Sequence, residues 1–189
     1  MSEAKLSVRD QLLTHRNRLT PAELVAAAEQ IADHLLASRE VALAATVAAY
    51  VSIGTEPGTG LLLDRLREAG KRVLLPCLLA DNDLDWALYD GDLRRARFGI
   101  LEPAGERLGV EAVAGADVVL VPGLAVDRTG LRLGRGGGSY DRALGRVPQG
   151  TFTCVLLHDG EVRDHVPSEP HDRPVTAAVT PGGGLVRFR

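Results

Sequence analysis

The alternation of apolar runs with an amphipathic segment constrains most strongly how this 189-residue chain can fold. The runs 45–52, 71–77 and 116–121 are nearly continuous in apolar residues, which is typical of strands buried on both faces of a sheet. The amphipathic segment 61–70 separates the first two runs and ends in Gly70, a residue suited to terminating a helix. Strands that alternate with helices indicate a mostly parallel sheet. We therefore predict an α/β fold with three layers, α/β/α, of the Rossmann-like kind.

Further elements complete the predicted architecture. Two helices are expected before the first strand, over 3–18 and 20–38, and the first has Leu6, Leu12 and Leu13 at helical spacing. The second begins with the letters TPAE, which predict a capping box with proline at the first helical position. We also expect a weaker strand over 84–91, a surface excursion over 91–116 and a short helix over 139–146. Two more strands are expected over 151–158 and 174–179, and a terminal turn over 181–184.

Charge and cysteine content limit the class of protein. The formal net charge is −3, so the chain lacks the positive excess typical of proteins that bind nucleic acid. No apolar run has the length of a membrane span, and the charged N-terminal segment lacks the apolar stretch of a secretory signal. Cys77 and Cys154 lie within apolar runs, which predicts buried free thiols. We expect a cytoplasmic monomer with small-molecule substrates and no nucleic-acid or membrane partner. We also expect one domain over 1–189, in which the N-terminal helices, 3–38, pack on the α/β core.

The segment LRLGRGGGSYDRAL, residues 131–144, is the clearest candidate binding motif. Glycines allow the backbone to approach a phosphate closely, and the helix expected after them presents free N–H groups to an anion. Arg132, Arg135 and Arg142 add guanidinium groups, which match phosphate oxygens. Asp141 suits such a site if a magnesium ion lies between its carboxylate and the phosphates. The segment therefore predicts a phosphate-binding loop with a metal beside it.

Two common phosphate-binding motifs do not fit this segment. A Walker A loop has lysine and then serine or threonine after its glycines, whereas Gly138 is followed by Ser139 and Tyr140. The dinucleotide fingerprint G-x-G-x-x-G, counted from Gly134, fails because Ser139 stands at its last glycine. A flexible glycine turn remains the alternative to phosphate binding. Parallel sheets bind ligands at the carboxyl ends of their strands, so we expect chemistry in the loops that follow Ser52, Pro76, Val121 and His158.

The segment VLVPGLAVDRTGLRLGRGGGSYDRAL, residues 119–144, resembles the signature of the 5-formyltetrahydrofolate cyclo-ligase family. That signature is approximately P-G-[LV]-A-F-D-x-x-G-x-R-L-G-[YR]-G-x-G-[YF]-Y-D-R. The resemblance extends, in order, to KLSVRDQLLTHRNRLTPAE at 5–23, to YVSIGTEPGTGLLLDRLREAGKRVLLP at 50–76, to FGILEP at 98–103 and to HVPSEPHDRPV at 165–175. It therefore covers nearly the whole chain.

The resemblance implies a three-layer α/β/α domain that binds ATP, a magnesium ion and a reduced folate. Lys5 and Arg9 match the family's nucleotide-contacting lysine and arginine, although two cations one helical turn apart are by themselves more often a solvated helix face. Asp141 and Asp172 match acidic positions implicated in magnesium binding. Without the resemblance, a first-turn helix residue and a turn residue are equally good readings of these two aspartates. The implied ATP site consists of Lys5, Arg9, Arg132, Gly134, Arg135, Gly136, Gly137, Gly138, Ser139 and Tyr140.

A folate site and a reaction are also implied by the resemblance. Glu56 matches the family's folate-contacting acidic segment, and its alternative is an acid on a loop surface. Tyr140 is implied to contact substrate, and its alternative is packing against a helix. The implied catalytic residues are Arg135 and Tyr140, and the implied substrate-binding residues are Glu56, Arg135, Gly137 and Tyr140. The implied reaction closes 5-formyltetrahydrofolate to 5,10-methenyltetrahydrofolate through a phosphorylated formyl group, with release of ADP and phosphate and without a covalent protein nucleophile.

Three positions depart from the family pattern. Gly58 stands where many members have an acidic residue, Val126 where they have an aromatic residue, and Ser139 where they have the first of two aromatic residues. Because we expect these positions around the folate, two alternatives stay open. One is a diverged member that acts on another pterin or small substrate, and the other is a non-catalytic nucleotide- or folate-binding protein. We expect His171 to be a structural loop residue and Trp86 to be a packing residue.

Overall fold

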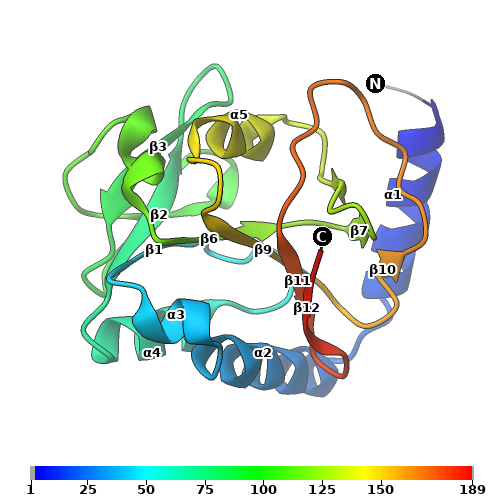
Figure 1. Ribbon diagram of the computed structural model, residues 1–189, viewed down its shortest axis with the longest axis horizontal. Coiled ribbons are helices and arrows are strands. Elements are labelled where there is room, and N and C mark those ends of the chain that lie inside the picture. The colour runs from blue at the N-terminus through cyan, green and yellow to red at the C-terminus, as the bar shows by residue number, and fades with distance from the viewer. Residues whose placement is uncertain (1–2, 189) are drawn as a thin grey trace.

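A seven-stranded sheet forms the centre of the computed structural model, which describes residues 3–188 (Figure 1). Its strands are β1 (Thr46–Ala48), β2 (Arg72–Leu78), β3 (Leu84–Leu88), β6 (Val118–Pro122), β9 (Phe152–Leu156), β11 (Ala177–Thr180) and β12 (Gly184–Arg187). They lie in the order β12-β11-β9-β6-β1-β2-β3. The inner strands run parallel, whereas β3 and β12 pair antiparallel with their neighbours at the two edges. The predicted mostly parallel sheet is confirmed.

Helices cover both faces of this sheet, which confirms the three predicted layers (Figure 1). One face carries α2 (Pro21–Leu36), α3 (Arg39–Leu43) and α4 (Gly60–Glu68). The other face carries α5 (Ser139–Arg146) and the 3₁₀ helix η2 (Val110–Gly115). Ile31 and Leu66 are buried in the core on the first face, and Trp86 is buried on the second. Full burial of one such apolar side chain contributes about 1.5–3 kcal/mol to folding, so these two cores hold the layers together.

The first helix, α1 (Glu3–Arg16), packs on a smaller sheet beside the main one (Figure 1). That sheet has the order β10-β7-β8 and consists of β7 (Ala125–Asp127), β8 (Arg132–Leu133) and β10 (Val162–Arg163). Leu12 is buried against this sheet, whereas Leu6 is 44% exposed, so the apolar stripe predicted for α1 is only partly correct. The hairpin β7–β8 separates β6 from the glycines.

Local signals fix several element ends as predicted. The Thr20 hydroxyl accepts a hydrogen bond from the Glu23 N–H, and the Glu23 carboxylate accepts one from the Thr20 N–H, so the capping box of α2 is confirmed. Gly70 follows α4 with φ of +76°, a left-handed conformation that favours glycine. The helix predicted over 139–146 coincides with α5. Cys77 and Cys154 are buried free thiols, as expected.

Other regions differ from the prediction for identifiable reasons. The strand predicted over 45–52 ends at Ala48, because Ser52 and Thr59 hydrogen-bond to each other and close a loop before α4. The predicted excursion over 91–116 contains an ordered hairpin formed by β4 (Leu93–Arg95), the short 3₁₀ turn η1 (Arg97–Gly99) and β5 (Leu101–Pro103). The turn predicted over 181–184 leads into β12, which the sequence did not reveal. Among residues 3–188, no helix combines the length and apolar character needed to cross a membrane.

Candidate active site

A cavity of about 1010 Å³ opens at the carboxyl edge of the parallel strands. Its walls come from the chain after β1, from the ends of β2 and β6, from the starts of β3 and β5, from α1, from the glycine segment and the start of α5, and from the loop before β11. The loop directly after His158, which was expected to contribute, does not line it. The residues that the sequence analysis assigned to a site all line this cavity: Lys5, Arg9, Glu56, Arg132, Gly134, Arg135, Gly136, Gly137, Gly138, Ser139, Tyr140, Asp141 and Asp172.

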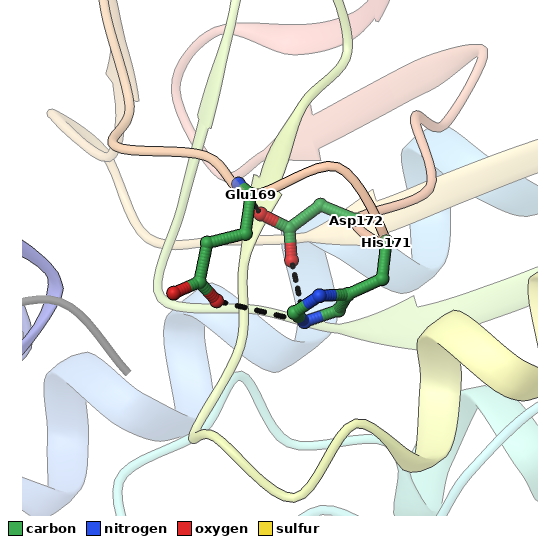
Figure 2. A group of neighbouring side chains, drawn as sticks. All are labelled: Glu169, His171 and Asp172. Atoms are coloured by element: carbon green, nitrogen blue, oxygen red, sulfur yellow. Dashed lines mark hydrogen bonds and ion pairs between the residues drawn. The ribbon is translucent and has the colours of Figure 1, made fainter.

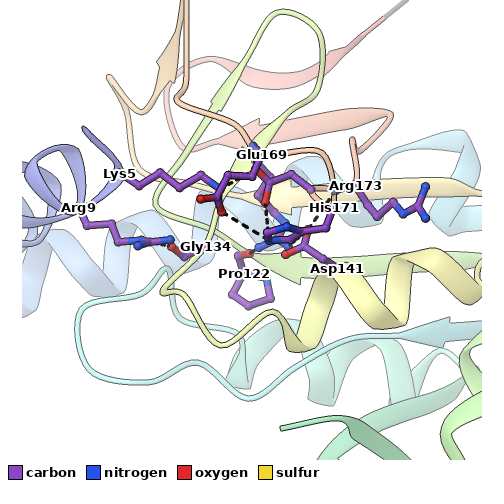
Figure 3. Close-up of polar contacts among 10 residues, drawn as sticks. Lys5, Arg9, Pro122, Gly134, Asp141, Glu169, His171 and Arg173 are labelled. Atoms are coloured by element: carbon purple, nitrogen blue, oxygen red, sulfur yellow. Dashed lines mark hydrogen bonds and ion pairs between the residues drawn. The ribbon is translucent and has the colours of Figure 1, made fainter. Parts of the chain in front are cut away.

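The glycine segment forms a loop between β8 and α5. Gly136 and Gly138 have φ of +108° and +69°, and Gly138 is the residue that precedes the first turn of α5. The Nε of Arg9 donates to the carbonyl of Gly134 at 2.7 Å, so α1 fixes the start of the loop (Figure 3). In the described part of the chain, the N–H groups of Gly136, Gly137 and Gly138 have no hydrogen-bond acceptor. A loop of this kind, leading into a helix, can bind an anion through its backbone.

A buried arginine lies beside this loop. One Nη of Arg132 is 3.1 Å from Oδ1 of Asp141, and the other donates to the carbonyl of Pro122 at 3.2 Å. The Arg132 guanidinium carbon also lies 5.9 Å from the centre of the Tyr140 ring. Oδ1 of Asp141 accepts a second hydrogen bond, from the backbone N–H of Arg173 at 3.1 Å (Figure 3). Asp141 therefore connects α5 to the loop that carries Asp172.

A carboxylate and two aromatic rings form another part of the cavity. Glu56 is buried, and its two carboxylate oxygens accept from Nε of Arg135 at 3.1 Å and from the N–H of Ile53 at 2.8 Å. The rings of Tyr50 and Tyr140 meet edge to face, with their centres 6.4 Å apart. Burial raises the pKa of both tyrosine hydroxyls, with a further contribution from the charge of Glu56, so both stay protonated at neutral pH. This part of the cavity offers an acceptor carboxylate beside neutral hydroxyls.

The third part is a cluster of opposite charges. Nζ of Lys5 lies 2.7 Å from Oδ2 of Asp172 and 3.0 Å from Oε2 of Glu169 (Figure 3). Burial by itself would lower the pKa of Lys5, but the hydrogen bonds to the two carboxylates outweigh burial and raise it. Burial would likewise raise the pKa of Asp172, but the hydrogen bond from Lys5 contributes to a net lowering. All three groups are therefore charged at neutral pH.

His171 completes a set of donors that suits a divalent metal. Its Nε2 is 3.5 Å from Oε2 of Glu169 and 3.8 Å from Oδ1 of Asp172, and ligand atoms of the three residues lie within 4.8 Å of one another (Figure 2). Carboxylate and imidazole ligands fit such an ion, but Lys5 already bonds to one oxygen of each carboxylate. A metal here would have to share these oxygens with Lys5. Asp141, predicted as the second ligand, lies outside this set and is linked to it through Arg173.

Some lining residues were not predicted from the sequence. Glu169 was missed, although an acidic residue three positions before Asp172 could have suggested it, and His171 was expected to have a structural role only. Tyr50 was missed because it continues a core strand run. The apolar lining was also missed, because its residues were assigned to buried strands, to a loop or to the surface excursion: Val51, Ile53, Pro76, Leu78, Leu84, Ile100 and Leu101.

The three departures from the family pattern occupy different places. Ser139 lines the cavity, whereas Val126 is buried in the core on the α5 face and does not line it. Gly58 also lies outside the cavity lining, and a Cβ at this position would be 3.1 Å from the Cβ of Ala28 in α2. Close packing against α2 therefore explains the glycine at position 58. Of the three, Ser139 is the residue placed to contact a ligand directly.

A glycine loop, buried cations and a carboxylate cluster around one cavity at the carboxyl edge of a parallel sheet define a class of α/β/α enzymes that act on small molecules. Within that class, residues 1–181 match the model of the 5-formyltetrahydrofolate cyclo-ligase family. The chain belongs to this family.

Relatives and solved structures agree with this assignment. The 5-formyltetrahydrofolate cyclo-ligase of Mycolicibacterium smegmatis is 47% identical over 152 residues, which cover 76% of this chain and 77% of the relative. The Escherichia coli protein of the same name is 34% identical over 171 residues, covering 88% and 94%. The solved structure of Aquifex aeolicus 5,10-methenyltetrahydrofolate synthetase superposes with a TM-score of 0.83 at 28% identity, covering 98% of this chain and 93% of that chain.

Proposed function

We propose that this protein uses ATP and Mg²⁺ to close 5-formyltetrahydrofolate to 5,10-methenyltetrahydrofolate, with release of ADP and phosphate. One observation carries the proposal. A single cavity joins a glycine loop flanked by cations to a buried carboxylate and two tyrosines. A phosphoryl donor and a donor-rich heterocycle can therefore be bound side by side, as a transfer between them requires. Membership of the cyclo-ligase family supports the identity of the two substrates.

The phosphates of ATP are proposed to bind at the glycine loop. Unpaired N–H groups of residues 136–138 would bind phosphate oxygens, and Arg132 and Lys5 would add positive charge. Arg9 would act by holding the loop through Gly134. The proposed ATP site comprises Lys5, Arg9, Arg132, Gly134, Arg135, Gly136, Gly137, Gly138, Ser139 and Tyr140.

Magnesium is proposed to bind at Asp172 and Asp141, where it would neutralise charge on the phosphates. The residues fit because both carboxylates line the cavity next to the loop. Lys5 now bonds to Asp172, so binding of the ion would free the Lys5 ammonium to contact the nucleotide. Glu169 and His171 would then remain beside Asp172 to orient its carboxylate or water molecules near it.

The pterin is proposed to bind at Glu56, whose carboxylate now accepts from Arg135 and would accept from donor groups on the ring edge. In the proposed reaction, the formyl oxygen attacks the γ-phosphorus of ATP and ADP leaves. Nitrogen 10 then attacks the activated formyl carbon, loses its proton, and the carbon–oxygen bond breaks as phosphate departs. Arg135 reaches from the glycine loop to Glu56, and this position supports a proposed contact with the transferred group. Tyr140 lies between the buried Arg132 and Tyr50 and would bind substrate with Gly137.

A coupled assay tests this proposal. The protein is incubated with MgATP and 5-formyltetrahydrofolate while the near-ultraviolet absorbance of the methenyl product and the release of ADP are followed together. We expect both signals at equal rates in the wild type and neither in an Asp141→Ala variant, with Asp33→Ala, an exposed carboxylate on α2, as the matched control. Binding of ATP with neither signal would favour a non-catalytic protein. ADP release with another pterin alone would favour a diverged enzyme, as the serine at position 139 allows.

A further inference from the structure

A buried ion pair lies at the end of α1, outside the cavity lining. Arg16 is fully buried, and its Nε and one Nη each lie 2.7 Å from a carboxylate oxygen of Glu161, which is itself buried. The same Nη donates to the carbonyl of Gly123 at 2.7 Å. This guanidinium therefore links α1 to the chain just after β6 and to the chain after β9.

The pair continues through a histidine to the loop that carries Glu56. Oε2 of Glu161 accepts from the N–H of His158 at 2.8 Å, and Nε2 of His158 is 2.9 Å from the carbonyl oxygen of Thr55. A carbonyl only accepts hydrogen bonds, so Nε2 carries the hydrogen in this contact. Burial lowers the pKa of His158, which favours the neutral ring. Thr55 directly precedes Glu56.

His158 contacts the backbone of the loop that carries Glu56, residues 53–58, from outside that loop. Over the part of the chain that the structure describes, no other side chain from outside the loop bonds to the backbone of residues 53–58. The remaining contacts are internal, such as the Glu56 carboxylate with the N–H of Ile53, or act on the Glu56 carboxylate itself, as Arg135 does. The backbone before Glu56 is therefore anchored by His158.

The energetics also indicate a role beyond stability. A buried ion pair recovers little net free energy after desolvation, and apolar residues of similar volume often stabilise a fold as well or better. One Nη of Arg16 moreover has no partner within residues 3–188, which adds an unfavourable term. What this pair provides instead is directional bonding, which holds three separate loops at the carboxyl edge of the sheet in one arrangement.

We propose that Arg16, Glu161 and His158 form a positioning network that fixes Glu56 in the cavity and so sets affinity for the substrate bound at Glu56, but not for the nucleotide. The identity of that substrate as 5-formyltetrahydrofolate rests on the proposed function. Within residues 3–188, the side-chain hydrogen bonds of these three residues lead to one another, to Gly123 and to Thr55, and not to the glycine loop or the Lys5 cluster. Loss of the His158 contact should therefore weaken binding of the substrate at Glu56 and leave binding of the nucleotide unchanged.

Variants of His158 test the network without leaving a buried charge unpaired, as variants of Arg16 or Glu161 would. In His158→Leu the donor to Thr55 is lost, whereas in His158→Gln an amide N–H can replace it. We expect His158→Leu to raise the KM for 5-formyltetrahydrofolate about tenfold, the usual effect of losing one ordering hydrogen bond, and to leave the KM for ATP within about twofold. His158→Gln should recover most of this loss.

His34→Leu is the matched control, because Nε2 of His34 contacts the carbonyl of Pro181 at 2.8 Å in the same manner but away from the cavity. It should leave both KM values unchanged. Equal rises of both KM values in His158→Leu, or an effect of His34→Leu as large, would overturn the positioning role.

Hydrogen exchange separates this inference from the proposed function. In the ligand-free protein, His158→Leu should increase amide exchange in peptides covering residues 53–59, with the glycine loop unchanged. This exchange measurement remains a valid test even if the wild type binds no 5-formyltetrahydrofolate. That result would refute the proposed substrate, but it would not refute the role of His158 in anchoring residues 53–58. Unchanged exchange over 53–59 in a folded His158→Leu protein would refute the anchor itself.

Discussion

The two N-terminal helices follow each other in the chain and have similar lengths, yet they bury opposite kinds of side chain. α1 has 14 residues and buries Lys5, Arg9, Leu12 and Arg16, whereas α2 has 16 residues and buries Ala27, Ile31, Ala32 and Leu35. Each set lies on one face of its helix. The spacing of the buried positions is therefore alike in the two helices, and only the chemical character of the buried side chains differs.

The partners of these side chains explain the difference. Each buried cation of α1 bonds to a loop. Lys5 and Arg9 bond to loops that line the cavity, at Asp172 and at the Gly134 carbonyl, and Arg16 bonds to Glu161 in a loop outside the lining. The buried face of α2 packs in the core of the main sheet. A helix that buries cations must find acceptors, because an unpaired buried charge is costly. Burial in α1 thus organises a site, and burial in α2 supports the fold.

Arg16→Leu should have the largest effect on folding. It leaves the Glu161 carboxylate buried and unpaired, and breaking such a pair costs about 3–5 kcal/mol. Urea denaturation measures the loss. The double variant Arg16→Leu/Glu161→Leu removes both charges and should recover much of the stability, while losing the order of the Glu56 loop. A single-variant loss below about 1 kcal/mol would mean that water reaches Glu161 and that α1 buries its charges less completely.

Ile31→Ala tests the other side of the comparison. Ile31 is fully buried between α2 and the sheet, so truncation should cost about 2–5 kcal/mol, and Ile31→Val should cost about 0.5–1.5 kcal/mol. Denaturation gives both values. The specific activity of the folded protein should be unchanged in each, because Ile31 does not line the cavity. A fall in kcat of the folded fraction would show that α2 shapes the site as well.

Lys5→Met should mainly affect activity. Lys5 keeps its charge in the cavity, so with the proposed nucleotide site its loss should lower kcat/KM about 100-fold, or about 2.7 kcal/mol. Steady-state kinetics with varied ATP measures it. Lys71→Met is the control, because the chain's second lysine bonds to the carbonyls of Ala42 and Ala44 outside the cavity. Wild-type kinetics in Lys5→Met would place the nucleotide elsewhere.

The same variant has a predictable pH signature. Asp172 and Glu169 have lowered pKa values, so their contribution to stability exists above the unfolded carboxyl range of about pH 4 and is lost as pH falls through the folded values. Lys5 has a raised pKa, so its contribution exists below about pH 10.4 and is lost as pH rises through the folded value. The stability difference between wild type and Lys5→Met should therefore be flat between these ranges and shrink on both sides. A difference that grew in acid would contradict the ion pair.

The contrast between the two helices also shows what sequence reasoning could reach. The start of α2 and the whole of α5 were predicted correctly, because capping residues and glycines act within a few positions. The contacts of α1 were beyond reach, since Lys5 meets Glu169 across 164 positions of the chain. Periodicity pointed to Leu6 in α1, yet Leu6 is exposed and Arg16 is buried. The resemblance to a family supplied Lys5, Arg9 and Asp172 as candidates, but neither the contact between Lys5 and Asp172 nor the second acid, Glu169.

Thr20→Ala should have the smallest effect and should separate local from tertiary control of α2. The Thr20 hydroxyl accepts from the Glu23 N–H at 3.3 Å at an exposed helix start, and loss of such a cap costs about 0.5–2 kcal/mol. Chemical denaturation measures the change, with kcat unaffected. Glu23→Gln is the control, because glutamine also completes a capping box and should cost less. If Thr20→Ala cost nothing, packing of Ile31 and Leu35 on the sheet would be sufficient to fix where α2 begins. The burial of α2 would then control even its first turn, as the cation contacts of α1 fix the loops around the cavity.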